Sequence, residues 1–352
     1  MRNKLATIAA AAAVVAGLLV STPAYAASIS AKGSSFANGM LQACTAAYTT
    51  HSVSYTSTGS GTGRTEFAAG NIDFGATDVP YTSGFPTTGK NARYLTIPLF
   101  GGPIVFAYSA TGVSDGLNLT PEIVSGILKG TITRWDDAAI KALNTKVKLP
   151  KKAIKVAYRA SGSGTNSNLT DYLRQTVGGW TTSSNMATSA GAGGVVGTSF
   201  ATAQLLAGYV EDNSNAFGYF DLSDANSADV AIAKLRNAAG AFFAPSSSAA
   251  GRFLSAQTVR PATDGDALGG TLNMDFTKVI SGAYQLTIPV YALAPRYTGS
   301  ERTSTDASKI AVRDFLNYVV KTCVPAKAAT LGYVPVGGAV RTAVLKQIGL
   351  VG

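Results

Sequence analysis

A glycine-rich turn between a predicted strand and a predicted helix is the most constraining feature of this sequence. The strand covers 154–158, the turn reads Arg-Ala-Ser-Gly-Ser-Gly-Thr over 159–165, and a helix-like run follows over 166–174. Backbone N–H groups and hydroxyls at a helix start, beside a permanently charged Arg159, suit a small oxyanion. The chain is therefore expected to contain an α/β unit that binds an anion.

The same pattern occurs twice more. Gly59-Ser-Gly-Thr-Gly63 precedes a helix-like run over 64–69, and Gly33-Ser-Ser-Phe36 precedes another over 37–44. Each segment alone is also compatible with an ordinary turn, because Ser and Gly favour turns. Ligands of open α/β sheets bind where strands end and helices begin. Three such segments together predict a protein that surrounds an oxyanion with hydrogen bonds.

Short β-like runs alternate with helical ones along the chain, which indicates an α/β fold. Strands are expected at 53–57, 71–76, 94–100, 103–108, 154–158, 216–220 and 286–292, and helices at 120–129, 136–143 and, strongly amphipathic, 304–321. The two strands between 94 and 108 are expected to flank a crossing point between two halves of the molecule.

Residues 1–26 have the pattern of a cleaved secretory signal. Arg2 and Lys4 precede an apolar run from Ala6 to Val20, and Ala24-Tyr25-Ala26 supplies small residues at a cleavage site. The apolar run is too short to span a membrane. We therefore expect an exported protein, periplasmic or alternatively secreted. Without these 26 residues the 352-residue chain keeps about 326, which fits two domains better than one.

The net charge favours anionic partners. The whole chain carries +10, and without Arg2 and Lys4 there remain 27 basic against 19 acidic residues. Such an excess steers anions over long range, although a basic surface that serves only solubility is the simpler alternative. The basic residues do not form a patch interleaved with aromatic residues, which argues against nucleic acid as a partner.

The chain has two cysteines, Cys44 and Cys323. Export to an oxidising compartment favours a disulfide, and two buried free thiols are the alternative. One histidine and two distant cysteines do not make a usual zinc site. No metal or other cofactor is therefore predicted.

Asp78 follows the strand predicted at 71–76 and would ordinarily be a cap or turn residue. Near an anion site its chemistry becomes selective. A carboxylate repels a bare anion but accepts a hydrogen bond from a protonated one. Phosphate keeps a proton near neutral pH and sulfate does not. One Asp among many donors therefore predicts a preference for phosphate.

Several blocks of the sequence together resemble the PstS family, the phosphate-binding proteins of phosphate ABC transporters. The blocks are Ser35-Phe36, Ser60 in Gly-Ser-Gly-Thr-Gly, Asp73–Asp78, Trp135–Ile140, Arg159–Thr165, Ala216–Tyr219 and Ile288-Pro289. The resemblance implies two α/β lobes joined by a crossover hinge, with a ligand cleft between them. It places lobe I at 27–98 plus 289–352 and lobe II at 99–288.

Carried over residue by residue, the resemblance also implies a set of phosphate ligands. They are Ser35, Phe36 through its backbone N–H, Ser60, Asp78, Arg159, Ser163, Gly164 through its backbone N–H, and Thr165. It further implies a monomer that captures inorganic phosphate and delivers it to the membrane permease of an ABC importer. An alternative on the same fold is a secreted scavenger of phosphate or another oxyanion. The disulfide would tie the first helix to the last within one lobe.

The sequence departs from the family pattern beside Arg159. Many members carry an acid two residues after this Arg, where it pairs with the guanidinium, and here that position is Ser161. The residues after Phe36 are Ala-Asn, where a Pro is common. A Gly-Asn-Asp-Gly-like turn of the family is replaced by 193–199. The first departure leaves Arg159 less neutralised.

A serine hydrolase is the alternative from another class. The segment 197–208 resembles the nucleophile segment of subtilisin-like proteases, with Ser199 as the nucleophile and Ala203 where a Pro is expected. A Ser nucleophile needs a His base that is oriented by an acid. The only histidine is His51, and no Asp or Glu precedes it. Only a His-acid-Ser order remains, and we therefore expect a binding protein rather than an enzyme.

Overall fold

The computed structural model describes residues 27–352 except 82–84, 86–87, 89–90, 262–265 and 297–305. The predicted signal at 1–26 lies outside the described residues. Among the residues that are described, no helix is long and apolar enough to cross a membrane.

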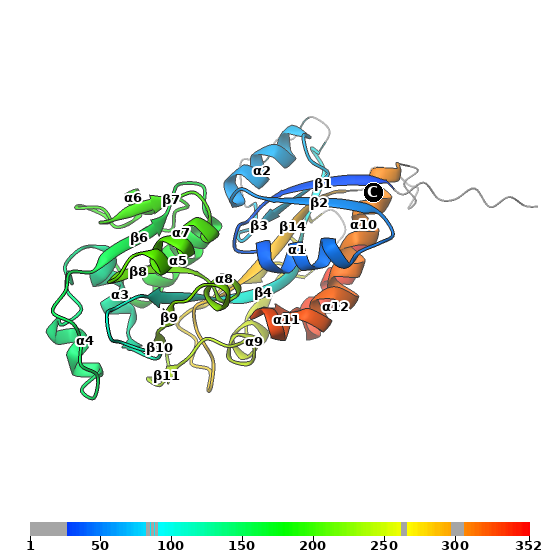
Figure 1. Cartoon of the computed structure of the whole chain (residues 1–352). Helices are drawn as coiled ribbons and strands as arrows, with labels where there is room; N and C mark the ends of the chain where they lie inside the picture. Colours follow the sequence, from blue (N-terminus) through cyan, green and yellow to red (C-terminus); the bar gives the residue numbers. More distant parts are fainter. Residues whose placement is uncertain (1–26, 82–84, 86–87, 89–90, 262–265, 297–305) are drawn as a thin grey trace, which may run out of the picture.

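A mixed ten-stranded sheet forms the frame of the molecule (Figure 1). Its order is β2-β1-β3-β14-β4-β8-β6-β7, and β15 and β9 also pair with β4. The strands are β1 (Ser28–Gly33), β2 (Ser52–Ser57), β3 (Phe74–Thr77), β4 (Tyr94–Tyr108), β6 (Lys155–Arg159), β7 (Thr198–Phe200), β8 (Ala216–Asp221), β9 (Ala231–Ile232), β14 (Thr287–Pro295) and β15 (Val334–Pro335). Short pairings outside it involve β5 (Asn118–Leu119), β10 (Lys234–Arg236), β11 (Phe242–Phe243), β12 (Thr258–Val259) and β13 (Leu272–Asn273).

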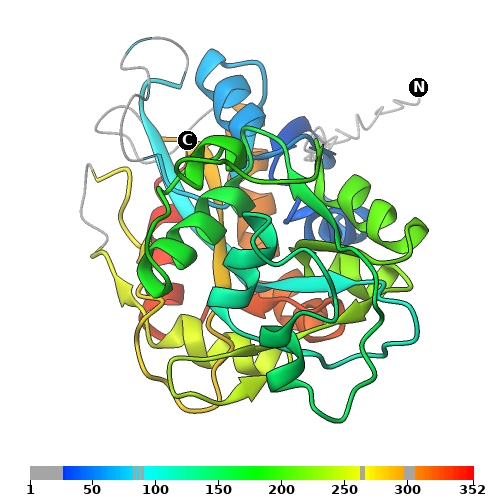
Figure 2. The ribbon, with the colours of Figure 1, turned by 90° about the vertical axis from the view of Figure 1, so that its left-hand side faces the viewer.

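Helices pack around this frame. They are α1 (Asn38–Ala47), α2 (Ser60–Ala69), α3 (Pro121–Leu128), α4 (Ala138–Leu143), α5 (Gly164–Thr176), α6 (Met186–Ser189), α7 (Ala203–Asp212), α8 (Leu222–Ser227), α9 (Ser247–Ser255), α10 (Ala307–Tyr318), a π-helical turn η1 (Val319–Cys323), α11 (Val324–Leu331) and α12 (Gly338–Ile348). In Figure 1, α1, α2 and α10 lie with β1–β3 on the right, and α5 and α7 lie with β6–β8 on the left. Figure 2 views the molecule from the side of β6–β8.

Strand β4 joins the two halves of the sheet. Its first part, 94–103, pairs antiparallel with β14, and its second part, 104–108, pairs antiparallel with β8. The break expected between 100 and 103 is therefore absent, because β4 runs through it. The glycines there serve packing: a methyl group on Gly101 would lie 2.2 Å from Leu254 Cδ1. The α/β fold class and its two-lobed form are confirmed, whereas the lobe boundaries at 98/99 and 288/289 stay a prediction.

The strand directions place the glycine-rich turns at 33–36, 59–63 and 159–165 at the carboxyl ends of strands. Strands β1, β2 and β3 are parallel, so their carboxyl ends lie at the same edge of the sheet. Strands β6, β7 and β8 are parallel as well. Each predicted turn follows one of these ends: Ser34 follows β1, Gly59 follows β2, and Ala160 follows β6.

The two cysteines form a disulfide, which confirms the expectation from the sequence. Cys44 on α1 and Cys323 at the end of η1 have Cα atoms 5.6 Å apart, and both side chains are buried. The bridge does not reach the last helix, since α10, η1, α11 and α12 follow one another. It therefore ties the first helix to the middle of the C-terminal helical segment.

Candidate anion-binding site

Asp78 lies at the centre of the three turns. Its carboxylate Oδ1 accepts a hydrogen bond from Ser34 Oγ, and Oδ2 accepts one from Ser60 Oγ at 3.2 Å. The side chain is 2% exposed. Burial raises the pKa of this carboxyl to about 6, although the hydroxyl donors and the positive charge of Arg159 act in the opposite direction. A carboxylate so deeply buried needs compensating donors, and the turns supply them.

Three predicted hydroxyls have their oxygen lone pairs engaged by backbone N–H groups. Ser163 Oγ accepts from Asn166 N at 3.2 Å, where it caps α5, and Ser60 Oγ accepts from Asp78 N at 3.1 Å. Ser35 Oγ accepts from Ala203 N at 3.1 Å, at the start of α7. Because each oxygen already accepts a bond, each hydroxyl is oriented as a donor. Ser60 donates to Asp78 Oδ2, and the hydroxyl protons of Ser35 and Ser163 remain for a further acceptor. Such oriented donors suit an anion that has only acceptor oxygens.

Arg159 is buried but has no carboxylate within ion-pair distance among the described residues. Its Nη2 donates to Ala201 O at 2.8 Å, and its Nε donates to Phe200 O at 3.4 Å. The side chain is 2% exposed. Burial lowers its pKa, and Tyr219, followed by the acids Asp78, Asp221 and Asp224, offsets part of this effect. A guanidinium has five N–H donors, so donors remain for a further acceptor.

The N-terminus of α5 directly faces Asp78 and Ser60. A methyl group on Gly164 would lie 2.4 Å from Ser60 Oγ and 2.7 Å from Asp78 Oδ2. The Asn168 side chain also joins α5 to Asp78, since its Nδ2 donates to Asp78 O at 2.8 Å. Gly59 lies near Arg159, whose Nη2 would be 3.7 Å from a methyl group at that glycine. The structure thus brings Ser60, Asp78, Arg159 and Gly164 together.

Thr165 and Phe36 complete the predicted set. Thr165 Oγ1, in the first turn of α5, is buried and has no hydrogen-bond partner among the described residues. A buried hydroxyl without a partner can bond to a ligand or a water molecule, so Thr165 is available to an anion at the start of α5. The Phe36 ring packs edge-on against Tyr333 with centroids 6.1 Å apart, and Phe36 O accepts from Tyr333 Oη at 2.8 Å. Because the ring is in the core, only the backbone of Phe36 remains to face a ligand.

Residues outside the predicted set hold these groups in place. Ser34 contacts Asp78 directly, and its position next to Ser35 was the available sequence signal. Tyr219 Oη accepts from Arg159 N at 3.1 Å and donates to Asn166 Oδ1 at 2.6 Å, which links β6, α5 and β8. Tyr219 lies within a block that carried the family resemblance, but no local pattern shows its partners.

The candidate hydrolase residues lie far apart in the topology. Ser199 is in β7, the edge strand at one end of the sheet order, and His51 immediately precedes β2 at the other end. His51 Nδ1 accepts from Ala27 N at 3.3 Å, and its Nε2 lies 3.7 Å from Asp314. The structure therefore does not bring this base to this nucleophile.

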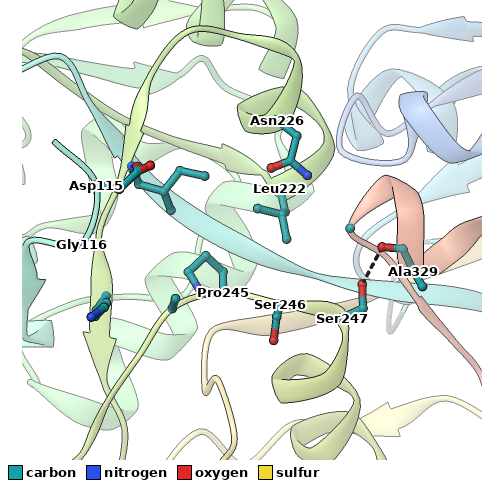
Figure 3. Close-up of a pocket in the computed structure, with 12 residues that line it drawn as sticks. Asp115, Gly116, Leu222, Asn226, Pro245, Ser246, Ser247 and Ala329 are labelled. Carbon is teal, nitrogen blue, oxygen red and sulfur yellow. Dashed lines mark hydrogen bonds between the residues drawn. The ribbon is translucent and has the colours of Figure 1, made fainter.

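A cavity of about 490 Å³ lies elsewhere, between the segment at Asp115, α8, the start of α9 and the end of α11 (Figure 3). Asp115 Oδ1 accepts from Ile232 N at 2.6 Å, and Ser247 Oγ donates to Ala329 O at 3.5 Å. Among the described residues that line it, none has a buried side-chain polar atom without a partner. None of the predicted anion ligands lines this cavity.

Curated relatives match between 39% and 87% of the chain. The phosphate-binding protein PstS of Xylella fastidiosa (strain Temecula1) is 29% identical over 87% of this chain and 81% of the relative. The PstS of strain 9a5c is 32% identical over 62% and 60%, and PstS 3 of Mycobacterium leprae is 37% identical over 39% and 37%. The resemblance to the PstS family is thereby confirmed.

Solved structures show the same fold. A high-affinity periplasmic phosphate-binding protein (PfluDING) bound with phosphate has a TM-score of 0.71 at 18% identity, over 90% of this chain and 92% of that one. The phosphate-binding protein of Stenotrophomonas maltophilia has a TM-score of 0.70 at 18% identity, over 91% and 93%. The model of the PBP superfamily domain matches residues 20–322, and this protein therefore belongs to the PBP superfamily.

Proposed function

We propose that this protein binds one inorganic phosphate ion among the turns that follow β1, β2, β3 and β6. The ligands would be Ser35, Ser60, Asp78, Arg159, Ser163, Thr165 and the backbone N–H groups of Phe36 and Gly164. The names of the PstS relatives, which are phosphate-binding proteins, support this choice of anion.

One observation carries the proposal: Asp78 is a hydrogen-bond acceptor at a site whose other groups are hydrogen-bond donors. Asp78 Oδ2 faces the N-terminus of α5, and the buried Arg159 lies nearby without an ionic partner among the described residues. A bare anion would be attracted by the donors and repelled by Asp78. A protonated phosphate would satisfy both, because its own O–H can donate to the carboxylate. Charge-assisted hydrogen bonds of about 1.5–3 kcal/mol each would offset the desolvation of the anion.

Capture would be followed by delivery to the membrane permease of an ABC importer. Two structural neighbours are described as a phosphate ABC transporter substrate-binding protein and an ABC-type phosphate transport receptor, which supports this role. The protein would act in the periplasm as a monomer and without chemical turnover of the ligand. Lobe I (27–98 plus 289–352) and lobe II (99–288) would close on phosphate by bending about the strands that cross between them.

Calorimetry of residues 27–352 with phosphate, arsenate and sulfate tests the proposal. We expect one phosphate per chain and no measurable heat with sulfate at pH 8. Arg159→Gln should abolish phosphate binding, because it removes the buried cation. Arg174→Gln is the matched control, since Arg174 pairs with Asp171 on the exposed surface of α5. Equal affinity for phosphate and sulfate, or unchanged binding by Arg159→Gln, would contradict the proposal.

A further inference from the structure

Ser34 is a buried hydroxyl that the predicted ligand set does not include. It is fully buried and directly follows β1. Its Oγ accepts a hydrogen bond from Ala37 N at 3.2 Å, so the hydroxyl proton is free to be donated to another group. That proton is donated to Asp78 Oδ1. The hydroxyl of Ser34 is therefore fixed as a donor to the carboxylate.

The two oxygens of Asp78 consequently have different surroundings. Oδ1 is held by Ser34, whereas Oδ2 faces Ser60 and the start of α5 at Gly164. Oδ2 therefore lies beside two of the proposed ligands, Ser60 and Gly164. A proton on Asp78 would turn the carboxyl into a donor, and a donor no longer repels an unprotonated anion. Selection by this carboxyl therefore requires that it stay ionised.

We propose that Ser34 is a specificity-determining positioning residue, whose hydroxyl keeps Asp78 an acceptor so that unprotonated oxyanions such as sulfate are rejected. The inference rests on the proposed function, because it concerns the anion that the same site selects. Ser34 acts through Asp78 and need not touch the ligand.

The direction of the effect follows from the surroundings of Asp78. Burial raises the pKa of Asp78 to about 6, and the bond from Ser34 opposes that rise. The other charged or titratable groups that act on it are Arg159 on β6 and Arg64 on α2, and Tyr55 on β2 lies close enough to sense its charge. Replacement of Ser34 leaves these three side chains in place. Loss of a donor to the ionised form must then raise the pKa of Asp78 further.

Sulfate affinity as a function of pH is the informative measurement. Sulfate does not titrate between pH 5 and 8.5, whereas phosphate does, so a sulfate profile reports the protein's own groups. Burial also raises the pKa values of Asp221 and Asp224, which act on Arg159, so the difference between the parent and Ser34→Ala profiles is what reports Asp78. In the parent protein, sulfate binding should appear only below about pH 6. In Ser34→Ala this onset should move upward by about one pH unit, which corresponds to roughly tenfold tighter sulfate binding at pH 8. Ser34→Cys keeps a weak donor of similar size and should lie between the two.

Ser30→Ala is the matched control. Ser30 lies on β1, four residues before Ser34, and its Oγ donates to an aspartate, Asp73 Oδ2, at 3.1 Å, outside the candidate site. This variant removes a Ser–Asp bond of the same kind and should leave the sulfate profile unchanged. If Ser34→Ala does not fold, Ser34→Cys carries the test against the same control.

A ¹³C NMR titration of the Asp78 carboxyl without ligand separates the two proposals. If the parent protein binds no anion, the proposed function fails, and the NMR titration still shows whether Ser34 sets the pKa of Asp78. If the parent binds phosphate selectively but Ser34→Ala changes neither the carboxyl titration nor the sulfate profile, the role of Ser34 is refuted and the proposed function stands.

Discussion

The backbone N–H of Gly61 donates to the carbonyl oxygen of Gly162 across 2.7 Å, so the first turn of α2 lies directly on the turn before α5. A methyl group on Gly61 would lie 2.9 Å from the Cα atom of Gly162. Backbones approach this closely only where a side chain is missing. The contact joins residues that follow β2 and β6, on opposite sides of the candidate site.

Gly61→Ala should weaken phosphate binding at least tenfold, because the added methyl group holds the two turns apart. Gly61 is the second residue of α2, and the added methyl group would meet backbone atoms of Gly162 rather than a flexible side chain, so the free energy of unfolding should fall as well. Calorimetry and urea denaturation measure the two quantities. Gly208→Ala is the control: Gly208 is inside α7 with open space around it, and its substitution should leave binding unchanged. Unaltered phosphate affinity in Gly61→Ala would show that binding does not need this contact.

Asp78→Asn should reduce the ratio of phosphate to sulfate affinity at least tenfold, which corresponds to about 1.4 kcal/mol. Asn keeps one oxygen that can accept from Ser34 and places an N–H donor toward the anion. It can therefore donate to sulfate, which the carboxylate repels. Titration with both anions at pH 8 measures the ratio. Asp73→Asn is the control, because Asp73 accepts from Ser30 outside the site. The hypothesis that Asp78 selects phosphate over sulfate is falsified if Asp78→Asn folds, binds phosphate and still rejects sulfate as the parent does.

The ionisation of Asp78 should also affect stability. Because burial raises its pKa from 3.8 to about 6, the folded protein binds the proton more tightly than the unfolded chain does. The stability of the ligand-free protein should therefore fall as the pH rises from about 4 to 6 and stay lower above that range. Asp78→Asn cannot ionise and should unfold at a higher urea concentration than the parent at pH 7.5, with little difference at pH 4. A constant difference between the two proteins across this range would show that Asp78 does not titrate abnormally.

Arg159→Lys should weaken phosphate binding more than the retained charge suggests. The planar fork of Arg159 bonds to Phe200 O and Ala201 O and still has N–H groups for an anion, whereas a lysine ammonium has three donors on a different geometry. We expect a loss of at least tenfold in calorimetry. Arg174→Lys, on the exposed face of α5, should have no effect. An unchanged dissociation constant for phosphate in Arg159→Lys would show that Arg159 does not bind the anion.

Reduction of the Cys44–Cys323 disulfide should lower the urea midpoint of unfolding without changing phosphate affinity. The bridge spans 279 residues of sequence. In the chain-entropy model a bridge that closes a long loop contributes about 4–5 kcal/mol, and measured values are often smaller. Comparison of the same chain before and after reduction isolates the cross-link. Two titratable thiols in the denatured, unreduced protein would show that the bridge does not form.

Local sequence was enough to predict many of the elements that carry the site. The strand expected at 154–158 is β6, and the helix expected after the 159–165 turn is α5. Their boundaries follow from turn chemistry and from a capping Ser163, which act between neighbouring residues. Strand β1 was not predicted, although its carboxyl end accepts hydrogen bonds from the turn that follows β2. The run 94–108 was wrongly divided into two strands at an expected crossing point, whereas it forms one continuous strand whose central glycines are required by packing.

By itself, the sequence determined the α/β character, the three turns with their hydroxyls, and the presence of a carboxylate and a guanidinium among them. Only the tertiary structure decided that Ser34 donates to Asp78, that Gly61 contacts Gly162, and that Ser35 meets the start of α7. Hydrogen bonding and periodicity within an element depend on residues a few positions apart. These contacts join residues 44, 101 and 168 positions apart, so they exist only once strand order and direction have placed the carboxyl ends of the strands together.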